Sequence, residues 1–313
     1  MSNKEFTALL DTIDHDVEAA STTNEIQSTT DSVSNYKGEL KYNNWTIYGF
    51  VLAFSGLAYF FFNQGYDWWY WIGTGGIAFA LIAYAYERTQ RLGKLSDHAY
   101  FKNILINYGL SERPLDIKEM QNSYEGFKRG NHKNVINYAY GSDDITVFKY
   151  HYEIERKDTF DKDKKTIDEY EQYGLMIRVG ADLRGMVICK KGLFRVQGEQ
   201  YKPAYNEFNK RLIMCGPDQM NLAKIMTPKV SEKMVGYHDY FKDLVVQVNG
   251  DVMCFTSEAE LMKFTPRQYG YETPSEFKQE LNKQVELHNF NHALELVELL
   301  DHKRIKLENG LAK

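Results

Sequence analysis

The feature that most constrains this chain is the stretch from Trp45 to Tyr86, which carries a single charged residue, Asp67. It consists of two apolar runs, residues 45–62 and 68–86, separated by only five residues. At about 1.5 Å per helical residue, each run just spans a hydrocarbon core of roughly 30 Å. Tryptophan and tyrosine gather at the run ends, as they do where a bilayer meets water. The pattern predicts an N-terminal transmembrane helical hairpin over residues 45–86.

Two competing interpretations of these runs are less favourable. A cleaved signal peptide starts with a basic leader and ends at small residues, whereas the first run begins after more than forty residues and has neither feature. Two buried helices of a soluble core would normally keep a polar stripe, and neither run has one. Because both runs lack ionisable residues, a single hairpin has no groups to relay protons or ions.

Packing and orientation of the hairpin follow from its small and basic residues. Gly49 with Ala53, and Gly76 with Ala80, lie four positions apart and are expected to let the two helices approach closely. Basic residues flank the outer ends of the hairpin, and none lies in its loop. By the positive-inside tendency, both termini are expected in the cytoplasm. The flanking basic residues are Lys37, Lys41, Arg88, Arg91 and Lys94.

The residues before the hairpin form an acidic leader. Residues 1–44 hold three basic and eight acidic side chains, which account for the whole net charge of −5. No region shows the basic surplus of a nucleic-acid binder, so no such partner is expected. Apolar residues at helical spacing from Phe6 to Val17 predict an amphipathic helix whose acidic polar face suits packing on protein. The Ser/Thr-rich residues 21–36 are either flexible or marginally helical.

The remainder of the chain predicts an α+β fold. A helix is expected from Asp97 to Gly109, followed by short alternating or β-branched runs typical of a mostly antiparallel sheet. Asn249-Gly250 has the turn chemistry of a tight hairpin. The capping-box sequence Thr273-Pro274-Ser275-Glu276 predicts the start of a long C-terminal helix. The chain is thereby divided into a leader (1–44), a hairpin (45–86) and a cytoplasmic domain (87–313).

Three patterns approach known chemistry, and each lacks an essential part. Residues 161–172 begin like a calcium loop but lack its turn glycine and closing glutamate. His288 and His292 lie four apart without the glutamate of a zinc protease motif. His238, beside Asp239, has no serine or cysteine elbow. We therefore expect no catalytic residue, metal or cofactor. Three widely separated cysteines are expected to be reduced core thiols: Cys189, Cys215 and Cys254.

One polar constellation is a candidate binding site. Asp218-Gln219 and Thr227-Pro228 each have the composition of a helix start, in which Asp218 and Thr227 accept backbone N–H groups. The structural interpretation is that these residues only cap helices. The alternative is that two helix N-termini with exposed polar side chains bind an anion or a partner segment through Asp218, Gln219 and Thr227.

The same region resembles a known family. Residues 207–234 (EFNKRLIMCGPDQMNLAKIMTPKVSEKM) are similar to the signature of an uncharacterised bacterial membrane family, domain of unknown function 3137. Residues 173–192 (YGLMIRVGADLRGMVICKKG) and 297–306 (VELLDHKRIK) resemble two further segments of it, while residues 109–165 fit loosely. The resemblance implies a two-span protein of the bacterial inner (plasma) membrane with a cytoplasmic α+β domain. It implies no activity, because none is assigned to the family.

These patterns favour an integral membrane protein that acts as a membrane-anchored interaction or scaffold module. Its expected partners are the lipid bilayer and a membrane-bound protein or further copies of the chain, because confinement to a membrane raises effective concentration. A membrane-associated hydrolase or ligand-sensing enzyme is the alternative, and clustering of Asp218, Gln219, His238 and Glu276 around one pocket would support it. A third hypothesis is a subunit of an oligomeric complex or pore.

Overall fold

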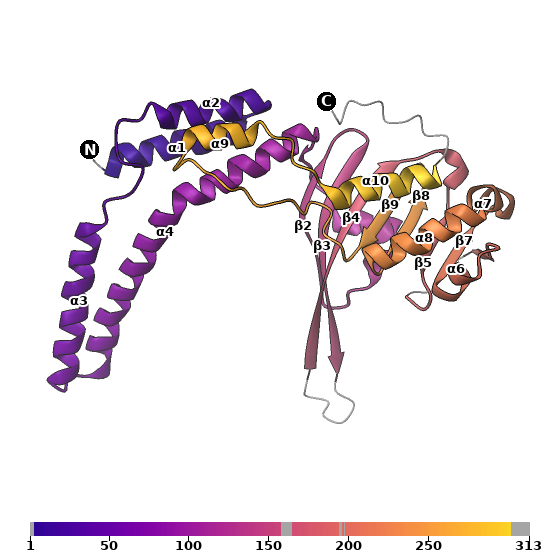
Figure 1. Cartoon of the computed structure of the whole chain (residues 1–313). Helices are drawn as coiled ribbons and strands as arrows, with labels where there is room; N and C mark the ends of the chain where they lie inside the picture. Colours follow the sequence, from indigo (N-terminus) through magenta and orange to yellow (C-terminus); the bar gives the residue numbers. More distant parts are fainter. Residues whose placement is uncertain (1–2, 158–164, 194–195, 197, 302–313) are drawn as a thin grey trace. The chain divides into compact units, whose positions relative to one another are not determined.

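The computed structural model describes residues 3–157, 165–193, 196 and 198–301 (Figure 1). The chain forms two compact units, which are described separately. Residues 1–106 group with residues 266–284, and residues 107–265 group with residues 285–313. The sequence-based division at residue 86 does not anticipate this grouping, because a short segment near the C-terminus packs with the N-terminal part of the chain.

The first unit is helical. Its elements are α1 (Asn3–Ala19), α2 (Thr23–Ser34), α3 (Trp45–Asn63), α4 (Trp68–Asn107) and α9 (Pro274–Leu281). The amphipathic helix expected in the leader is α1, which buries Phe6, Leu10, Ile13 and Val17. The helix packs on protein as expected, and Asp11 on its exposed acidic side forms an ion pair with Arg91 of α4.

Residues 21–36, for which the sequence left two interpretations open, contain the helix α2. Its N-terminus is closed by a capping box in which the Thr22 hydroxyl accepts from the Glu25 amide and the Glu25 carboxylate accepts from the Thr22 amide. The buried side of α2 contacts the segment 266–284, where the Thr29 and Tyr271 hydroxyls lie 2.6 Å apart. The marginal composition is thus offset by capping and tertiary packing.

Helix α4 is continuous over 40 residues. The prediction of a separate helix capped by Asp97 is wrong, because nothing between the apolar run and Asp97 breaks the helix. Asp97 lies in its middle and pairs with Arg267 at 2.7 Å. The predicted stop is confirmed, since Gly109 follows the helix end with φ +63°, a conformation that glycine adopts without strain.

Helix α3 and the first part of α4 lie side by side (Figure 1). Ring centroids of Phe62 and Trp71 are 5.7 Å apart near the connecting loop, and Asn44 Nδ2 donates to the Ala85 carbonyl at 3.4 Å near the other end. Among the described residues, one helix is long and apolar enough to cross a membrane, and that helix is α3. The first half of α4 does not meet this test, because its tryptophans, tyrosines and glycines lower its mean hydropathy.

The packing predicted at the small residues of the hairpin is wrong in this structure. Gly49, Ala53, Gly76 and Ala80 are all exposed, and among the described residues nothing beyond the local helix backbone comes within 4 Å of a Cβ atom built at Gly49 or Gly76. The less exposed positions instead recur every three or four residues. They are Ile47, Val51, Phe54, Ala58 and Phe61 on α3, and Trp71, Thr74, Gly75, Ala78, Leu81 and Ala85 on α4. Each of the four small residues lies two positions from Val51 or Ala78, about 200° around the helix and so on the far side.

The second unit is built on one nine-stranded antiparallel sheet in the order β1-β2-β3-β4-β9-β8-β5-β7-β6, which confirms the α+β class. Its strands are β1 (Ser111–Glu112), β2 (Lys133–Gly141), β3 (Ile145–Lys157), β4 (Lys165–Arg178), β5 (Val187–Lys190), β6 (Glu199–Tyr201), β7 (Leu212–Gly216), β8 (Val245–Asn249) and β9 (Val252–Ser257). The predicted hairpin joins β8 to β9, but its two turn residues are Gly250, at φ +61°, and Asp251, because Asn249 is still paired with Val252 at the end of β8. Sequence alternation therefore located the principal strands.

Helices cover both faces of this sheet. On one side α8 (Pro228–Phe241) and α10 (His288–Leu300) lie together, with the Phe241 ring 4.9 Å from that of Phe255 on β9. On the other, α5 (Ile117–Ser123) and the turn η1 (Glu125–Lys128) enclose an aromatic cluster with Phe127, Phe148, Tyr150 and Tyr152. The remaining elements are η2 (Ala181–Leu183), α6 (Asn206–Arg211) and α7 (Gln219–Ile225).

The long C-terminal helix expected from residue 273 is not formed. Two shorter helices, α9 and α10, replace it, and they belong to different compact units. Residues 282–287 between them are not helical, and the Thr273 side chain makes no capping hydrogen bond. The apolar periodicity continues across the break because each helix buries its own row of side chains, Phe277 and Leu281 in α9, and Phe290 and Val297 in α10.

Candidate functional site

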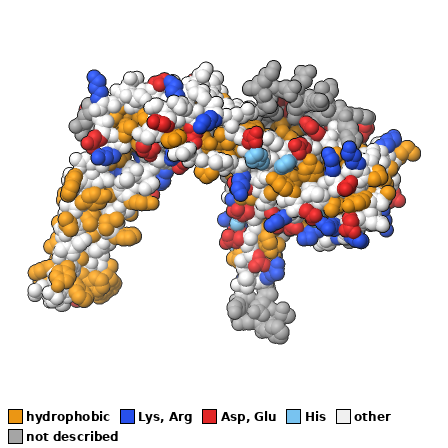
Figure 2. Space-filling view, viewed as in Figure 1, with side chains coloured by type: hydrophobic (Ala, Val, Ile, Leu, Met, Phe, Trp, Pro, Cys, Tyr) orange, Lys and Arg blue, Asp and Glu red, His pale blue; other side chains and the backbone are white. Residues whose placement is uncertain are grey.

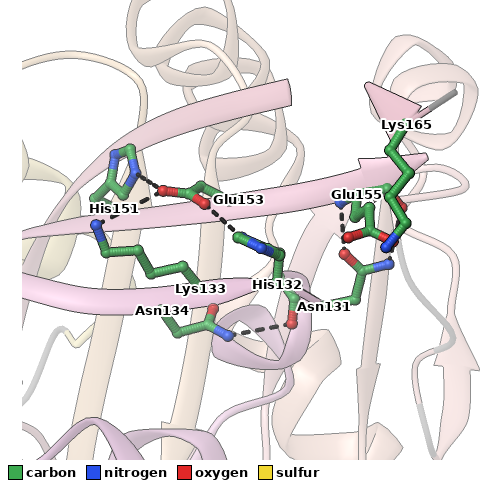
Figure 3. A network of polar contacts seen from close by, with 9 residues as sticks. Asn131, His132, Lys133, Asn134, His151, Glu153, Glu155 and Lys165 are labelled. Atoms are coloured by element: carbon green, nitrogen blue, oxygen red, sulfur yellow. Dashed lines mark hydrogen bonds and ion pairs between the residues drawn. The ribbon is translucent and has the colours of Figure 1, made fainter. Parts of the chain in front are cut away.

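The most connected polar group in the sheet unit is centred on Glu153 of β3 (Figure 3). Antiparallel pairing places Glu153 opposite Lys133 of β2, and the residue just before that strand is His132. Since side chains alternate along a strand, His151 points to the same face as Glu153. The group formed by His132, Lys133, His151 and Glu153 is called the Glu153 cluster below.

One carboxylate holds the Glu153 cluster together. His132 Nδ1 lies 2.7 Å from Glu153 Oε2, and His151 Nε2 lies 3.3 Å from Glu153 Oε1. Lys133 Nζ adds an ion pair at 3.7 Å. The hydrogen bond from His132 is the main cause that holds the pKa of Glu153 below its usual value, assisted by His151 and Lys133. Glu153 therefore stays ionised and fixes the orientation of two imidazole rings.

A second ion pair continues the polar surface along the same face. Lys149 of β3 binds Glu171 of β4 at 2.7 Å, and the Tyr173 hydroxyl donates to the other oxygen of Glu171 at 3.2 Å. Register places His151 directly opposite Glu171. The hydrogen bond from Lys149 is the main cause that lowers the pKa of Glu171, and the pKa of Lys149 is raised by the same bond.

The chemistry of this surface is that of charge recognition. A carboxylate-oriented imidazole is available at His132, whose side chain is 44% exposed. A general base, however, needs a substrate site beside it, and none of the main cavities in the described residues is lined by a member of the Glu153 cluster. The exposed members of this surface, His132, Lys133 and Glu171, carry both signs of charge and suit contact with a complementary surface.

The residues predicted as a binding site, Asp218, Gln219 and Thr227, are used in local structure. Asp218 accepts from the Met220 and Asn221 amides at 2.9 and 3.1 Å, which caps α7. Gln219 donates to the Glu199 carbonyl at 3.0 Å, and Thr227 caps α8 by accepting from the Val230 amide at 3.3 Å. The capping interpretation thus has direct geometric support, and binding at these residues stays a prediction.

The four residues whose clustering would favour an enzyme are divided between the two units. Glu276 belongs to the first unit, whereas Asp218, Gln219 and His238 belong to the second. His238 does not pair with its neighbour Asp239, which instead binds Arg211 at 2.7 Å. His238 Nδ1 is buried without a hydrogen-bond partner, and burial is the main cause that lowers its pKa.

The remaining sequence candidates are likewise placed. His288 and His292 of α10 pair with different carboxylates, Glu286 at 3.4 Å and Glu295 at 2.9 Å. Within the described residues, no group of three or more potential ligands is arranged to hold a metal. The calcium-loop residues Asp161 and Asp163 lie outside the described residues. All three cysteines are free and buried as predicted, and burial raises the pKa of Cys189 to about 11.

The Glu153 cluster was missed in the sequence, although part of its signal is visible there. The alternating strand 145–155 places Lys149, His151 and Glu153 on one face. What the sequence does not give is the register that brings Lys133 and His132 against Glu153.

Comparison of the chain with known protein families, with curated proteins and with solved structures finds no match. The resemblance to domain of unknown function 3137 stays a prediction.

Proposed function

We propose that this chain is a membrane-anchored interaction module, in which α3 and the first part of α4 insert into the bilayer as a hairpin and hold the sheet unit at the membrane surface. The observation that supports this proposal most strongly is the exposure of the apolar side chains of the hairpin. Helix α3 buries no residue, whereas α1, α2, α8 and α10 each bury an apolar row. Figure 2 shows the hydrophobic side chains of the hairpin exposed on the visible face.

The size of this exposed surface supports a lipid environment. Eighteen of the twenty-one large hydrophobic side chains that are exposed in the described residues lie between Trp45 and Tyr86. Trp45, Leu52 and Phe79 are 80%, 75% and 74% exposed. At about 1.5–3 kcal/mol per fully buried side chain, leaving this set in water forgoes on the order of 20 kcal/mol. A soluble monomer does not normally expose an apolar surface of this extent.

The second span of the proposal is residues 68–86 of α4. Its tryptophans and tyrosines lower its mean hydropathy, but these residues prefer the membrane–water interface over either solvent. The Trp68 and Trp69 rings stack at 5.4 Å beside the hairpin loop. Basic residues at the opposite end, including Lys41 and Arg88, favour a cytoplasmic location for both termini under the positive-inside tendency. The family resemblance implies that this membrane is the bacterial plasma membrane.

The proposed partner is a membrane-bound protein or another copy of this chain, and the proposed contact surface is the Glu153 cluster with its neighbours Lys149 and Glu171. This surface presents both signs of charge without a cavity, which favours protein recognition over turnover of a small substrate. Anchoring confines the encounter to two dimensions and raises the effective concentration of both partners.

Insertion and topology are tested by cysteine labelling in intact cells. The native cysteines are buried, so a new cysteine reports its own position. Gln64→Cys, in the hairpin loop, is expected to react with a membrane-impermeant maleimide from outside. Lys37→Cys, a matched exposed position before α3, is expected to react only after permeabilisation. Release of the chain by alkaline carbonate, or equal labelling of both variants from one side, would refute the anchored topology.

The partner surface is tested by crosslinking in the same membranes. The charge reversal Lys149→Glu is expected to reduce crosslinking to the partner, whereas Lys263→Glu, a reversal at an exposed position away from the Glu153 cluster, is not. Unchanged crosslinking of Lys149→Glu would reject this surface while leaving the membrane anchor intact.

A further inference from the structure

A cavity of about 540 Å³ lies in the first unit, where the chain enters α3. It is bounded by the loop 39–45, by Tyr48 of α3, by Arg88, Thr89 and Leu92 of α4, by Phe6 and by Glu272. Its volume falls in the range of roughly 300–1,000 Å³ typical of ligand sites. In the proposed topology this is the cytoplasmic boundary of the membrane, where Trp45, Tyr42 and Tyr48 form an aromatic belt.

One wall of the cavity contains a buried acceptor with no partner. Asn44 is only 7% exposed, and its Nδ2 donates toward the Ala85 carbonyl at 3.4 Å and toward Thr89 Oγ1 at 3.3 Å. Its Oδ1 is buried and receives no hydrogen bond. A buried, unsatisfied oxygen costs free energy unless a donor reaches it. A ligand N–H or O–H group would satisfy this oxygen from the cavity once the side chains that cover it move aside.

The same cavity offers a place for an anion. Arg88 lies over the Tyr42 ring at 4.1 Å and the Tyr84 ring at 5.5 Å, and within the described part of the chain it makes no ion pair. Asn44 stands at the N-cap position of the 19-residue helix α3, but its side chain does not cap that helix. The Trp45 amide donates to Asn43 Oδ1 at 3.1 Å, so the next amides of the first turn, with the positive end of the helix dipole, favour negative charge here.

The charges that line the cavity limit the chemical class of its ligand. Arg88 and Lys41 are accompanied in the lining by Glu39 and Glu272, and Lys41 pairs with Glu39 at 3.4 Å. The lining is thus neutral overall and carries both signs, which suits a zwitterion better than a polyanion. A headgroup that joins a phosphodiester to a primary ammonium satisfies each requirement: an anion for Arg88, and N–H donors for Asn44 Oδ1.

We propose that this cavity binds the headgroup of a phosphatidylethanolamine lipid, with the phosphate against Arg88 and the start of α3 and the ammonium donating to Asn44 Oδ1. The inference rests on the proposed membrane anchor. Phosphatidylcholine is the matched control ligand, because it has the same charges but its quaternary ammonium has no N–H donor.

The test is native mass spectrometry of the full chain released from mixed micelles that contain equal amounts of both lipids, with identical acyl chains. Phosphatidylethanolamine is expected to be retained about tenfold more than phosphatidylcholine, the ratio that one hydrogen bond from a charged donor supplies. N,N-dimethyl-phosphatidylethanolamine keeps one N–H group and is expected to be retained well above phosphatidylcholine. This series varies the donor without altering the protein.

Variants then identify the residues that bind the phosphate and the ammonium of the headgroup. Arg88→Gln is expected to lower the retention of both lipids, whereas Lys37→Gln, an exposed position outside the cavity, leaves it unchanged. Asn44→Ala, in a preparation with unchanged circular dichroism, is expected to abolish the preference between the two lipids.

Equal retention of the two lipids, or stronger retention of phosphatidylglycerol, would overturn the assignment. A second experiment adds O-phosphoethanolamine alone as a competitor. If this soluble headgroup displaces the lipid at equimolar concentration, the site serves a soluble phosphate ester and the lipid assignment is wrong. Carbonate extraction keeps the two proposals apart. A chain that resists extraction but retains no phosphatidylethanolamine contradicts only this inference, whereas an extractable chain contradicts the anchor itself.

Discussion

The acidic leader is held to the first unit by a buried hydroxyl pair, and removing either hydroxyl should loosen α2. Tyr271 is fully buried, and its hydroxyl lies 2.6 Å from Thr29 Oγ1. Thr29 also donates to the Ile26 carbonyl at 2.6 Å, so the Tyr271 hydroxyl is the donor to Thr29. Tyr271→Phe removes this bond and leaves the ring in place. A buried neutral hydrogen bond contributes about 1 kcal/mol, which corresponds to roughly a fivefold change in an opening equilibrium.

The assay is native-state hydrogen exchange of the full chain in mild detergent at pH 7, followed by mass spectrometry of a peptide from α2. Tyr271→Phe is expected to speed exchange about fivefold in α2, because this helix opens locally rather than with the whole protein. All four tryptophans lie in the hairpin, so tryptophan fluorescence would not report this opening.

A double-mutant cycle provides the decisive comparison. Thr29→Ala and Tyr271→Phe should each raise α2 exchange, and the double variant should raise it by less than the product of the two, with a coupling of about 1 kcal/mol. Ser32→Ala, an exposed substitution on the same helix, is the control and should change little. If the two substitutions are strictly additive, the hydroxyl pair does not connect α2 to Tyr271 and the packing argument fails.

Three further predictions concern the second unit. As the pH falls below 4.5, the wild-type protein should lose more stability than the Glu153→Gln variant. The folded state holds the pKa of Glu153 below that usual value, so the stabilisation from the ionised carboxylate disappears once it is protonated. Parallel acid-unfolding curves of the two proteins would contradict this. Gly174→Ala should destabilise by about 1–3 kcal/mol, since the new methyl group would overlap the Phe148 ring, whereas Gly236→Ala on the open side of α8 should be neutral or stabilising; urea unfolding of both variants measures the difference. Cys254 should resist thiol reagents until the protein unfolds, because burial raises the pKa of its thiol and excludes the reagent; labelling of the native chain at that position would contradict its burial.

The parts of the fold that sequence predicts well are those decided by neighbours along the chain. Strand β3 was visible as alternation, and the reversal between β8 and β9 was visible from Gly250, which adopts positive φ without strain. The apolar face of α1 follows from helical spacing alone. In each case the physical cause acts within a few residues, so a local pattern carries it.

Sequence-based prediction fails where contacts with a distant part of the chain determine the local structure. Lys94 and Asp97 look like the interval between a membrane span and a new helix, but α4 continues because no residue there breaks it and Arg267 pairs with Asp97 from 170 positions away. The break after Leu281 has the opposite origin. Its periodicity is intact, yet the two halves pack in different units, so the chain must leave the helix between them. Periodicity records which residues are buried, and it does not record what buries them.

The Glu153 cluster is a clearer case of a feature that local sequence patterns do not determine. Placing Lys149, His151 and Glu153 on one face needs only the two-residue repeat of a strand. Placing Lys133 against Glu153 needs the register of β2 on β3, and that register shifts at a bulge between Ile136 and Tyr138. A one-residue slip sends every side chain of a strand to the opposite face, so without knowledge of the bulge the sequence would assign half of β2 to the wrong side. The Glu153 cluster therefore cannot be assembled from a local pattern. Asn137 is the residue that the pairing of β2 with β3 skips, so deleting it should remove the bulge and keep Lys133 opposite Glu153; loss of that pair in a structure of the variant would contradict this register.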